Sequence, residues 1–188
     1  MNDAHIASII SAVAGITGVL LGNSFVAIKE WGINRKRETR DSVYLSILVS
    51  SHLDRFANGC LAVAFDDGTS EGRPAGRDGE YFQTTVRAPE FIPLDIDVEW
   101  KVLPKDLMYD VLQIPDKREQ IENELSGIFE FDEPPDYTEF FWARRRKYAE
   151  LGLHASAVEI RLRKHANMPI EKSSPGEWNR NVALLNLI

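Results

Sequence analysis

Acidic side chains gather at two places in the chain where they could act together. Asp66 and Asp67 follow an apolar stretch, and Asp95 and Asp97 alternate with apolar residues in the sequence LDIDVEWKV. Paired carboxylates can hold a divalent metal or act as general acid and base in hydrolysis. Rows of Asp and Glu more often face solvent, however. We therefore expect no catalytic residue, no metal and no cofactor, and keep a metal-dependent hydrolase built on these four carboxylates as the alternative.

The stretch DGTSEGRPAGRD (67–78) partly matches a calcium-binding loop. Its first, fifth, sixth and twelfth positions fit the motif, but Thr69 replaces the required carboxylate or amide at the third position and Pro74 occupies the eighth. An Asp/Gly turn explains the pattern better. The segment 72–79 likewise lacks the lysine and the strand–loop–helix context of a phosphate-binding loop.

Cysteine and histidine give no pattern of metal ligands. Cys60 is the single cysteine, which excludes an intrachain disulfide and multi-cysteine zinc sites. A nucleophilic pair would need Cys60 beside His52 or His154, whereas a lone cysteine is commonly a small core residue. No HExxH sequence occurs.

A charge-free run of 23 residues extends from Ile6 to Ile28. A helix of that length measures about 35 Å, enough to cross a hydrocarbon core of about 30 Å. A signal peptide would carry basic residues before the run, whereas here they follow it. A buried core helix would normally be shorter and have a polar face. The sequence therefore predicts an uncleaved membrane anchor.

Basic residues after the run predict its orientation. Because basic loops stay in the cytoplasm, the N-terminus is expected outside the membrane and the remaining chain in the cytoplasm. Trp31 lies where an aromatic ring would sit among the lipid headgroups. The predicted interface anchors are Trp31, Arg35, Lys36, Arg37 and Arg40.

Small residues recur every four positions within the run, at Ala14, Gly18 and Gly22. This spacing lets two membrane helices approach closely, which predicts self-association into a homo-oligomer. The alternative is that Gly and Ala are simply frequent in membrane helices.

The rest of the chain has mainly helical patterning. A stripe at helical spacing predicts a helix from about Thr39 to Phe65, through Leu45, Leu48, His52, Phe56, Cys60 and Val63. Prolines at 104, 115 and 134–135 introduce three further helices, the last ending near Met168. The segment 66–103 is rich in Gly and Pro and predicts a long irregular loop with an extended arm packed on the helices.

The stretch YTEFFWARRRKY (137–148) combines aromatic with basic residues. One interpretation, which we favour, is pairing with the acidic segment 119–139 within the fold. The other is contact with lipid headgroups or a partner, through Phe141, Trp142, Arg144, Arg145 and Arg146.

Several stretches resemble an uncharacterised family of bacterial and prophage-encoded single-pass membrane proteins. They are HLDRFANGC followed by DDG, VEWKVLP, PPDYTEFFWARRRKYAELGL and LRKHANMP, and they cover most of residues 45–170. The resemblance implies a bacterial origin and a recurrent helical unit, so the anchor is expected in the inner membrane of a bacterium. The resemblance implies no activity for this chain and identifies no functional residue in it.

Together these features predict a mainly α protein: a transmembrane helix followed by an antiparallel helical bundle with one long irregular loop. We expect an anchor at 1–33, a cytoplasmic helical domain at 34–168 and a loosely ordered tail at 169–188. The net charge of −7 argues against nucleic acid as a partner. The expected function is a membrane-anchored scaffold that binds an unknown protein. The alternatives are the hydrolase above, tethered to the membrane, and an oligomeric membrane effector in phage–host conflict.

Overall fold

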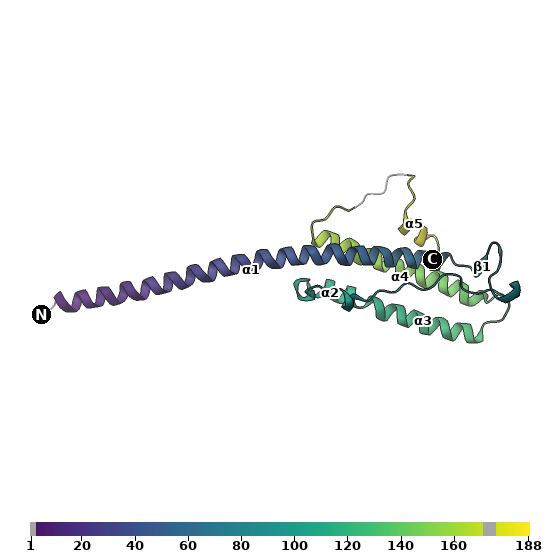
Figure 1. The fold of residues 1–188 in the computed structure, drawn as a ribbon, viewed down its shortest axis with the longest axis horizontal. Coiled ribbons are helices and arrows are strands. Elements are labelled where there is room, and N and C mark those ends of the chain that lie inside the picture. Colours follow the sequence, from purple (N-terminus) through teal and green to yellow (C-terminus); the bar gives the residue numbers. More distant parts are fainter. Residues whose placement is uncertain (1–2, 171–175) are drawn as a thin grey trace. The chain divides into compact units, whose positions relative to one another are not determined.

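The computed structural model describes residues 3–170 and 176–188, with side chains described from residue 29 onward within those ranges. The fold is mainly helical (Figure 1), as predicted. The chain divides into two units, Met1–Asp41 and Ser42–Ile188. Within the part of the chain that is described, no helix has a stretch long and apolar enough to cross a membrane. The side chains of the charge-free run 6–28 lie outside that part.

The first unit consists of the N-terminal part of helix α1 (Asp3–Phe65). The Arg35 guanidinium lies over the ring of Trp31, 5.1 Å from its centroid, and the Trp31 side chain is exposed. Farther along, Arg37 and Arg40 both lie within 4 Å of the Asp41 carboxylate. The division after Asp41 falls later than the boundary expected at residue 33.

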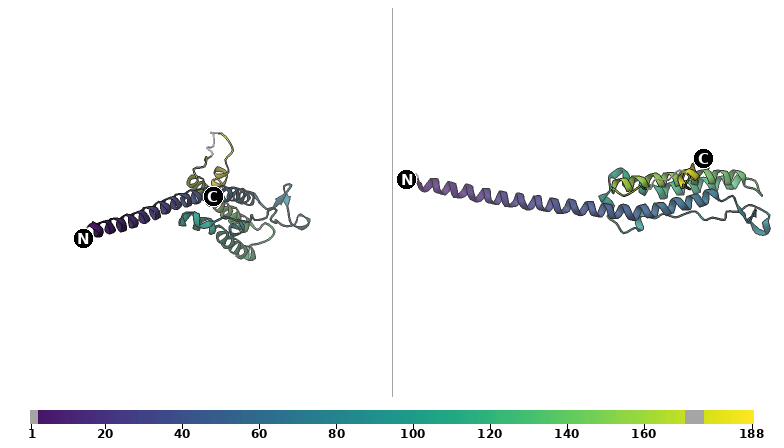
Figure 2. Two further views of the ribbon diagram at one scale, coloured as in Figure 1. Left: turned by 60° about the vertical axis from the view of Figure 1, so that its left-hand side comes forward. Right: turned by 90° about the horizontal axis from the view of Figure 1, so that it is seen from above.

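The second unit is a helical bundle. It contains the C-terminal part of α1 together with α2 (Lys105–Leu112), α3 (Ile114–Phe131), α4 (Thr138–His165) and α5 (Arg180–Leu185). Side-chain contacts fix the directions of three of these helices. The pairs Ser42–His165 and Asp66–Arg144 show that α4 is antiparallel to α1. The pairs Glu122–Tyr148 and Phe129–Phe140 show that it is also antiparallel to α3. Figure 2 shows α4 running along this part of α1.

The core lies between α1 and α4 and is closed by α2, α3 and α5. Small residues let α1 and α4 approach closely, because Gly152 packs against Cys60 of α1 and Leu184 of α5. The fully buried large side chains include Leu45, Val49, Leu53, Val63, Val111, Ile114, Tyr148, Val158, Leu162 and Leu184.

The predicted core stripe on α1 was wrong at His52, and its member Leu48 is only half-buried. His52 is exposed, whereas Val49 and Leu53 are fully buried. The buried positions advance by four, four and three residues from Leu45 to Phe56, which keeps one helical face toward α4. Because His52 was predicted to be buried in place of Leu53, the predicted buried face of α1 was rotated away from the one that packs in the core.

Between α1 and α2 the chain forms only short elements. A two-residue hairpin, β1 (Thr69–Ser70) with β2 (Arg73–Pro74), is followed by the 3₁₀ turns η1 (Arg77–Gly79), η2 (Pro93–Asp95) and η3 (Trp100–Val102). The arm before α2 packs on the helices through Phe91 and Leu103, which are buried. Gly68 has a φ of +79°, and a Cβ there would meet the Phe141 ring at 2.4 Å. Glycine is therefore required at this turn both for conformation and for space.

Within the tail expected at 169–188, the described residues 180–185 form helix α5 instead of a loosely ordered segment. Asn179 caps α5 by accepting a hydrogen bond from the Val182 amide, and Leu184 is fully buried. Arg180 donates to the Asp54 carboxylate of α1 at 2.7 Å and to the Ser156 hydroxyl of α4 at 3.1 Å. One guanidinium therefore ties α5 to both central helices.

The close packing at Gly152 gives a test of the bundle. In Gly152→Ala the new methyl group would lie 3.0 Å from Leu184 and 3.1 Å from Cys60, so these neighbours must give by a few tenths of an ångström. We expect urea unfolding to report a loss of about 1–3 kcal/mol, as for other overpacked cores. The matched control is Gly127→Ala in α3, where no atom lies within 4 Å of the new methyl. That change should raise stability by up to about 1 kcal/mol. Equal effects at both sites would contradict this packing.

Candidate functional site: a cavity between α3, α4 and residues 81–90

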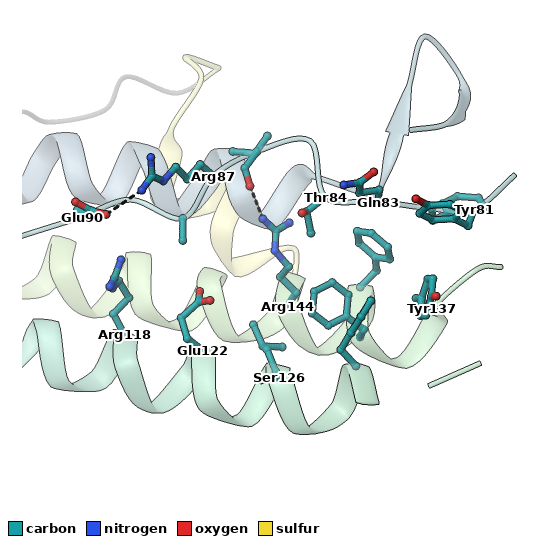
Figure 3. Close-up of a pocket in the computed structure, with 17 residues that line it drawn as sticks. Tyr81, Gln83, Thr84, Arg87, Glu90, Arg118, Glu122, Ser126, Tyr137 and Arg144 are labelled. Carbon is teal, nitrogen blue, oxygen red and sulfur yellow. Dashed lines mark hydrogen bonds and ion pairs between the residues drawn. The ribbon is translucent and has the colours of Figure 1, made fainter. Parts of the chain in front are cut away.

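A cavity with a volume of about 660 Å³ lies between α3, α4 and the loop segment 81–90 (Figure 3). Volumes of this order are typical of small-molecule sites. Aromatic rings line one end, and charged side chains line the other. The whole cavity lies within the second unit.

The aromatic end is a connected set of rings. Phe129 near the end of α3 stacks on Tyr137, with centroids 4.7 Å apart, and meets Phe140 of α4 edge-on at 5.2 Å. Phe141 contacts Phe140 at 5.2 Å and Phe82 at 6.4 Å. Edge-to-face contacts of this kind hold the rings in fixed positions. This end of the cavity is therefore an apolar wall with defined shape.

Two arginines and two glutamates make up the charged end. Arg87 lies 3.5 Å from Glu90 on the loop segment. On α3, Glu122 accepts a hydrogen bond from the Tyr148 hydroxyl, and burial together with the Glu122 charge raises the pKa of Tyr148. Arg118 donates one hydrogen bond of 3.3 Å to the Pro89 carbonyl.

Arg144 lies between the two ends and joins three segments. It is buried and donates to the Asp66 carboxylate at 2.7 Å, to the Val86 carbonyl at 2.6 Å and to the Val63 carbonyl at 3.4 Å. Its guanidinium therefore connects α4 with the end of α1 and with the loop segment that forms one wall of the cavity. Figure 3 includes its bond to Val86.

Asp66 is the acceptor at the centre of this arrangement. Besides Arg144, its carboxylate accepts from the amides of Gly68, Thr85 and Val86 at 3.0–3.2 Å and from the Thr85 hydroxyl at 2.7 Å. Burial opposes ionisation, but the hydrogen bonds from Val86, Thr85 and Gly68 and the Arg144 charge outweigh it. The pKa of Asp66 consequently lies below its usual 3.8.

The aromatic and basic stretch on α4 divides into two sets of residues. Phe141 packs under Gly68 and Arg144 is buried, so the prediction that these two side chains face lipid or a partner was wrong. Trp142, Arg145 and Arg146 are exposed, and Arg146 lies 5.7 Å over the Trp142 ring. The neighbouring Lys147 pairs with Glu124 of the acidic segment at 2.8 Å. The helical period decides which side chain turns inward.

The structure does not assemble the four aspartates of the hydrolase alternative. Asp66 is committed to Arg144, whereas Asp95 and Asp97 are exposed. Asp67 accepts from the Thr69 amide and hydroxyl, the Asp/Gly turn expected in place of a calcium loop. Over the described residues, no group of three His, Cys, Asp or Glu side chains could hold a metal ion.

Cys60 has no histidine partner and sits in the core. Burial raises the pKa of its thiol to about 12, so the thiolate needed for nucleophilic attack is not formed near neutral pH. His154 lies at a smaller pocket, where burial and Lys117 lower its pKa. The Nε2 atom of His154 is buried without a hydrogen-bond partner.

The predicted membrane residues fall in the first unit. The side chains of Ala14, Gly18 and Gly22 lie outside the described residues. Arg35, Lys36, Arg37 and Arg40 are exposed, like Trp31.

Sequence reasoning singled out Phe141 and Arg144 but missed the other residues at both ends of the cavity. Arg118, Glu122 and Phe129 lie on one helix at steps of four and seven residues, which is a weak sign that they share a face. Nothing in the sequence connects that face to the loop segment 81–90, because the contact depends on Asp66 and Arg144, 78 residues apart.

The Asp66 carboxylate gives a prediction for pH dependence. Asp66→Asn leaves the buried Arg144 without a counter-charge, and we expect it to lower the free energy of unfolding by about 3–5 kcal/mol at neutral pH. Because the folded pKa of Asp66 is depressed, the stabilisation is complete above about pH 4 and is lost as the pH falls through the folded pKa. The difference between wild type and variant, measured by urea unfolding, should shrink on acidification.

Asp97→Asn is the matched control, since Asp97 is an exposed carboxylate on the same connecting segment. Its difference from wild type should stay near zero throughout. A difference for Asp66→Asn that does not change with pH would contradict an ionised Asp66 in the fold.

Comparisons with known proteins add no functional residue to this geometry. No family model matches the chain, and no curated protein or solved structure matches it. The resemblance of residues 45–170 to a family of single-pass proteins stays a prediction. The function is therefore inferred from the residues and their arrangement.

Proposed function

We propose that the protein is a single-pass membrane protein whose folded cytoplasmic unit binds a protein partner and has no catalytic activity of its own. The N-terminus lies outside and the bundle inside the cell. Ala14, Gly18 and Gly22 form the face through which two copies associate. The bilayer, a second copy and an unidentified protein are thus the proposed partners.

The observation that carries this proposal is the order of three segments along helix α1: a charge-free segment, a basic segment and a segment with buried positions. Helix α1 extends from Asp3 to Phe65 without an interruption. It contains in order the charge-free run 6–28, the basic residues 35–40, and the buried positions from Leu45 to Ala64. An apolar zone of membrane length that is followed by basic residues is the arrangement of an inward-facing anchor.

Exposed side chains on the bundle support a binding role. Trp142 is 61% exposed, and the neighbouring Arg145 and Arg146 are also exposed. Tryptophan and arginine are enriched among the residues that dominate protein–protein binding energy. We assign this Trp142–Arg146 surface to an acidic partner protein, because Arg145 supplies a complementary charge, whereas Arg146 pairs with Glu150 at 3.1 Å.

Membrane insertion has a direct test in the full-length protein. Replacing both Ile16 and Leu20 by Lys places two charges in the middle of the run, each costing about 2.5–3.5 kcal/mol in a bilayer. We expect the variant to leave the carbonate-washed membrane fraction, in which the wild type remains. Ile47→Lys is the control, because Ile47 is an exposed apolar residue on the same helix within the bundle. Extraction of the wild type by carbonate would refute the anchor.

Self-association has a separate test. Leucine at Gly18 and Gly22 would keep the two backbones apart, so a bacterial two-hybrid assay in the membrane should lose its signal. The control is Gly32→Leu, at a position where no atom lies within 4 Å of the Cβ that the substitution adds. An unchanged signal in the Gly18 and Gly22 variant would rule out this face.

A further inference from the structure

The cavity at α3 and α4 is elongated, with different chemistry at its two ends. Arg118 and Phe129 line opposite ends and lie eleven positions apart on α3, which corresponds to about 16 Å of helix. Leu125 and Ser126 lie between them. The occupant must therefore be longer than a single ring, polar at one end and apolar at the other.

Arg118 identifies the charge of the polar end. It is half-buried and forms no ion pair with any residue that the structure describes. Its 3.3 Å bond to Pro89 uses one of the five N–H groups of the guanidinium. Of the other charged groups here, Arg87 pairs with Glu90, and Glu122 accepts a hydrogen bond from the neutral Tyr148 hydroxyl. The group with the most hydrogen-bond donors left free is the Arg118 guanidinium, which favours an acidic group on the ligand.

The two glutamates restrict the anion that could bind. Glu90 and Glu122 line the same end as Arg118 and would repel a dianion or a polyanion. A single carboxylate matches the planar fork of the guanidinium and adds only one negative charge. This favours a carboxylate over a phosphate.

At the far end, the aromatic rings need an apolar group. Phe129, Phe140 and Phe141 line the cavity, and the Phe129 side chain is 47% exposed. An unbranched acyl chain can extend past Leu125 to these rings and remove their surfaces from water. Each methylene buried in this way adds to the affinity.

We propose that this cavity binds a single-chain carboxylic acid, a medium-chain fatty acid in chemical class. Its carboxylate pairs with Arg118, and its acyl chain extends along α3 to Phe129 and Phe140. The inference concerns the bundle alone and does not depend on the membrane anchor.

The test uses lauric acid carrying a diazirine at its methyl end. The full-length protein is irradiated with this probe, and the labelled peptides are identified by mass spectrometry. We expect labelling within residues 126–143, where the aromatic end of the cavity lies. The primary amide of the same probe has equal length but no charge, and it should label about tenfold less, as expected for the loss of a charge-assisted hydrogen bond.

Matched arginine variants separate the cavity from general attraction. Arg118→Met should reduce labelling by the acid about tenfold without changing labelling by the amide, and Arg118→Lys should restore part of it. Arg145→Met removes an exposed arginine on α4 that does not line the cavity and should have no effect. Circular dichroism confirms that each variant is folded before comparison.

Two results would overturn the proposal. Equal labelling by acid and amide would leave no role for Arg118. Labelling confined to residues 6–28 would place the probe at the charge-free run instead of the cavity. Failure of the anchor test affects neither result, because labelling at 126–143 can be read in membranes or in buffer.

Discussion

The buried pair of Asp66 and Arg144 is the interaction on which the second unit depends. Asp66 directly follows the last residue of α1, and Arg144 lies in the first half of α4. Arg144 also donates to Val86, and Asp66 accepts from Thr85 and Val86, so the segment that closes the cavity is held from both sides. A carboxylate and a guanidinium withdrawn from water are tolerated only when their remaining donors and acceptors are satisfied. Here backbone groups satisfy them, which couples the helix packing to the position of the loop.

The helices themselves could be predicted from local sequence. Pro104 and Pro115 mark the starts of α2 and α3, because proline is accepted in a first turn and fixes φ there. The periodic apolar residues of α1 predicted its buried half, with the error at His52. These features depend on neighbours within one or two helical turns, and sequence patterns record such neighbours directly.

The cavity and its charged groups could not be predicted in the same way. Arg144 stands in a run of four basic residues whose members look equivalent in sequence. Only its position on the inward face of α4, opposite Asp66, makes it a structural residue while Arg145 and Arg146 stay in solvent. That selection is made by tertiary packing between distant segments. The C-terminal residues were misjudged for the same reason, since α5 is short and is held by Arg180 and Leu184.

Two arginines line the same cavity and differ in their surroundings. Arg144 meets a carboxylate and two carbonyls within the protein, so its charge is neutralised and its role is to hold segments together. Arg118 donates to one carbonyl and forms no ion pair with a residue that the structure describes. Leaving a half-buried guanidinium without a counter-ion costs stability, and this cost is removed when an external carboxylate binds. The contrast in acceptors therefore assigns Arg144 to the fold and Arg118 to a ligand.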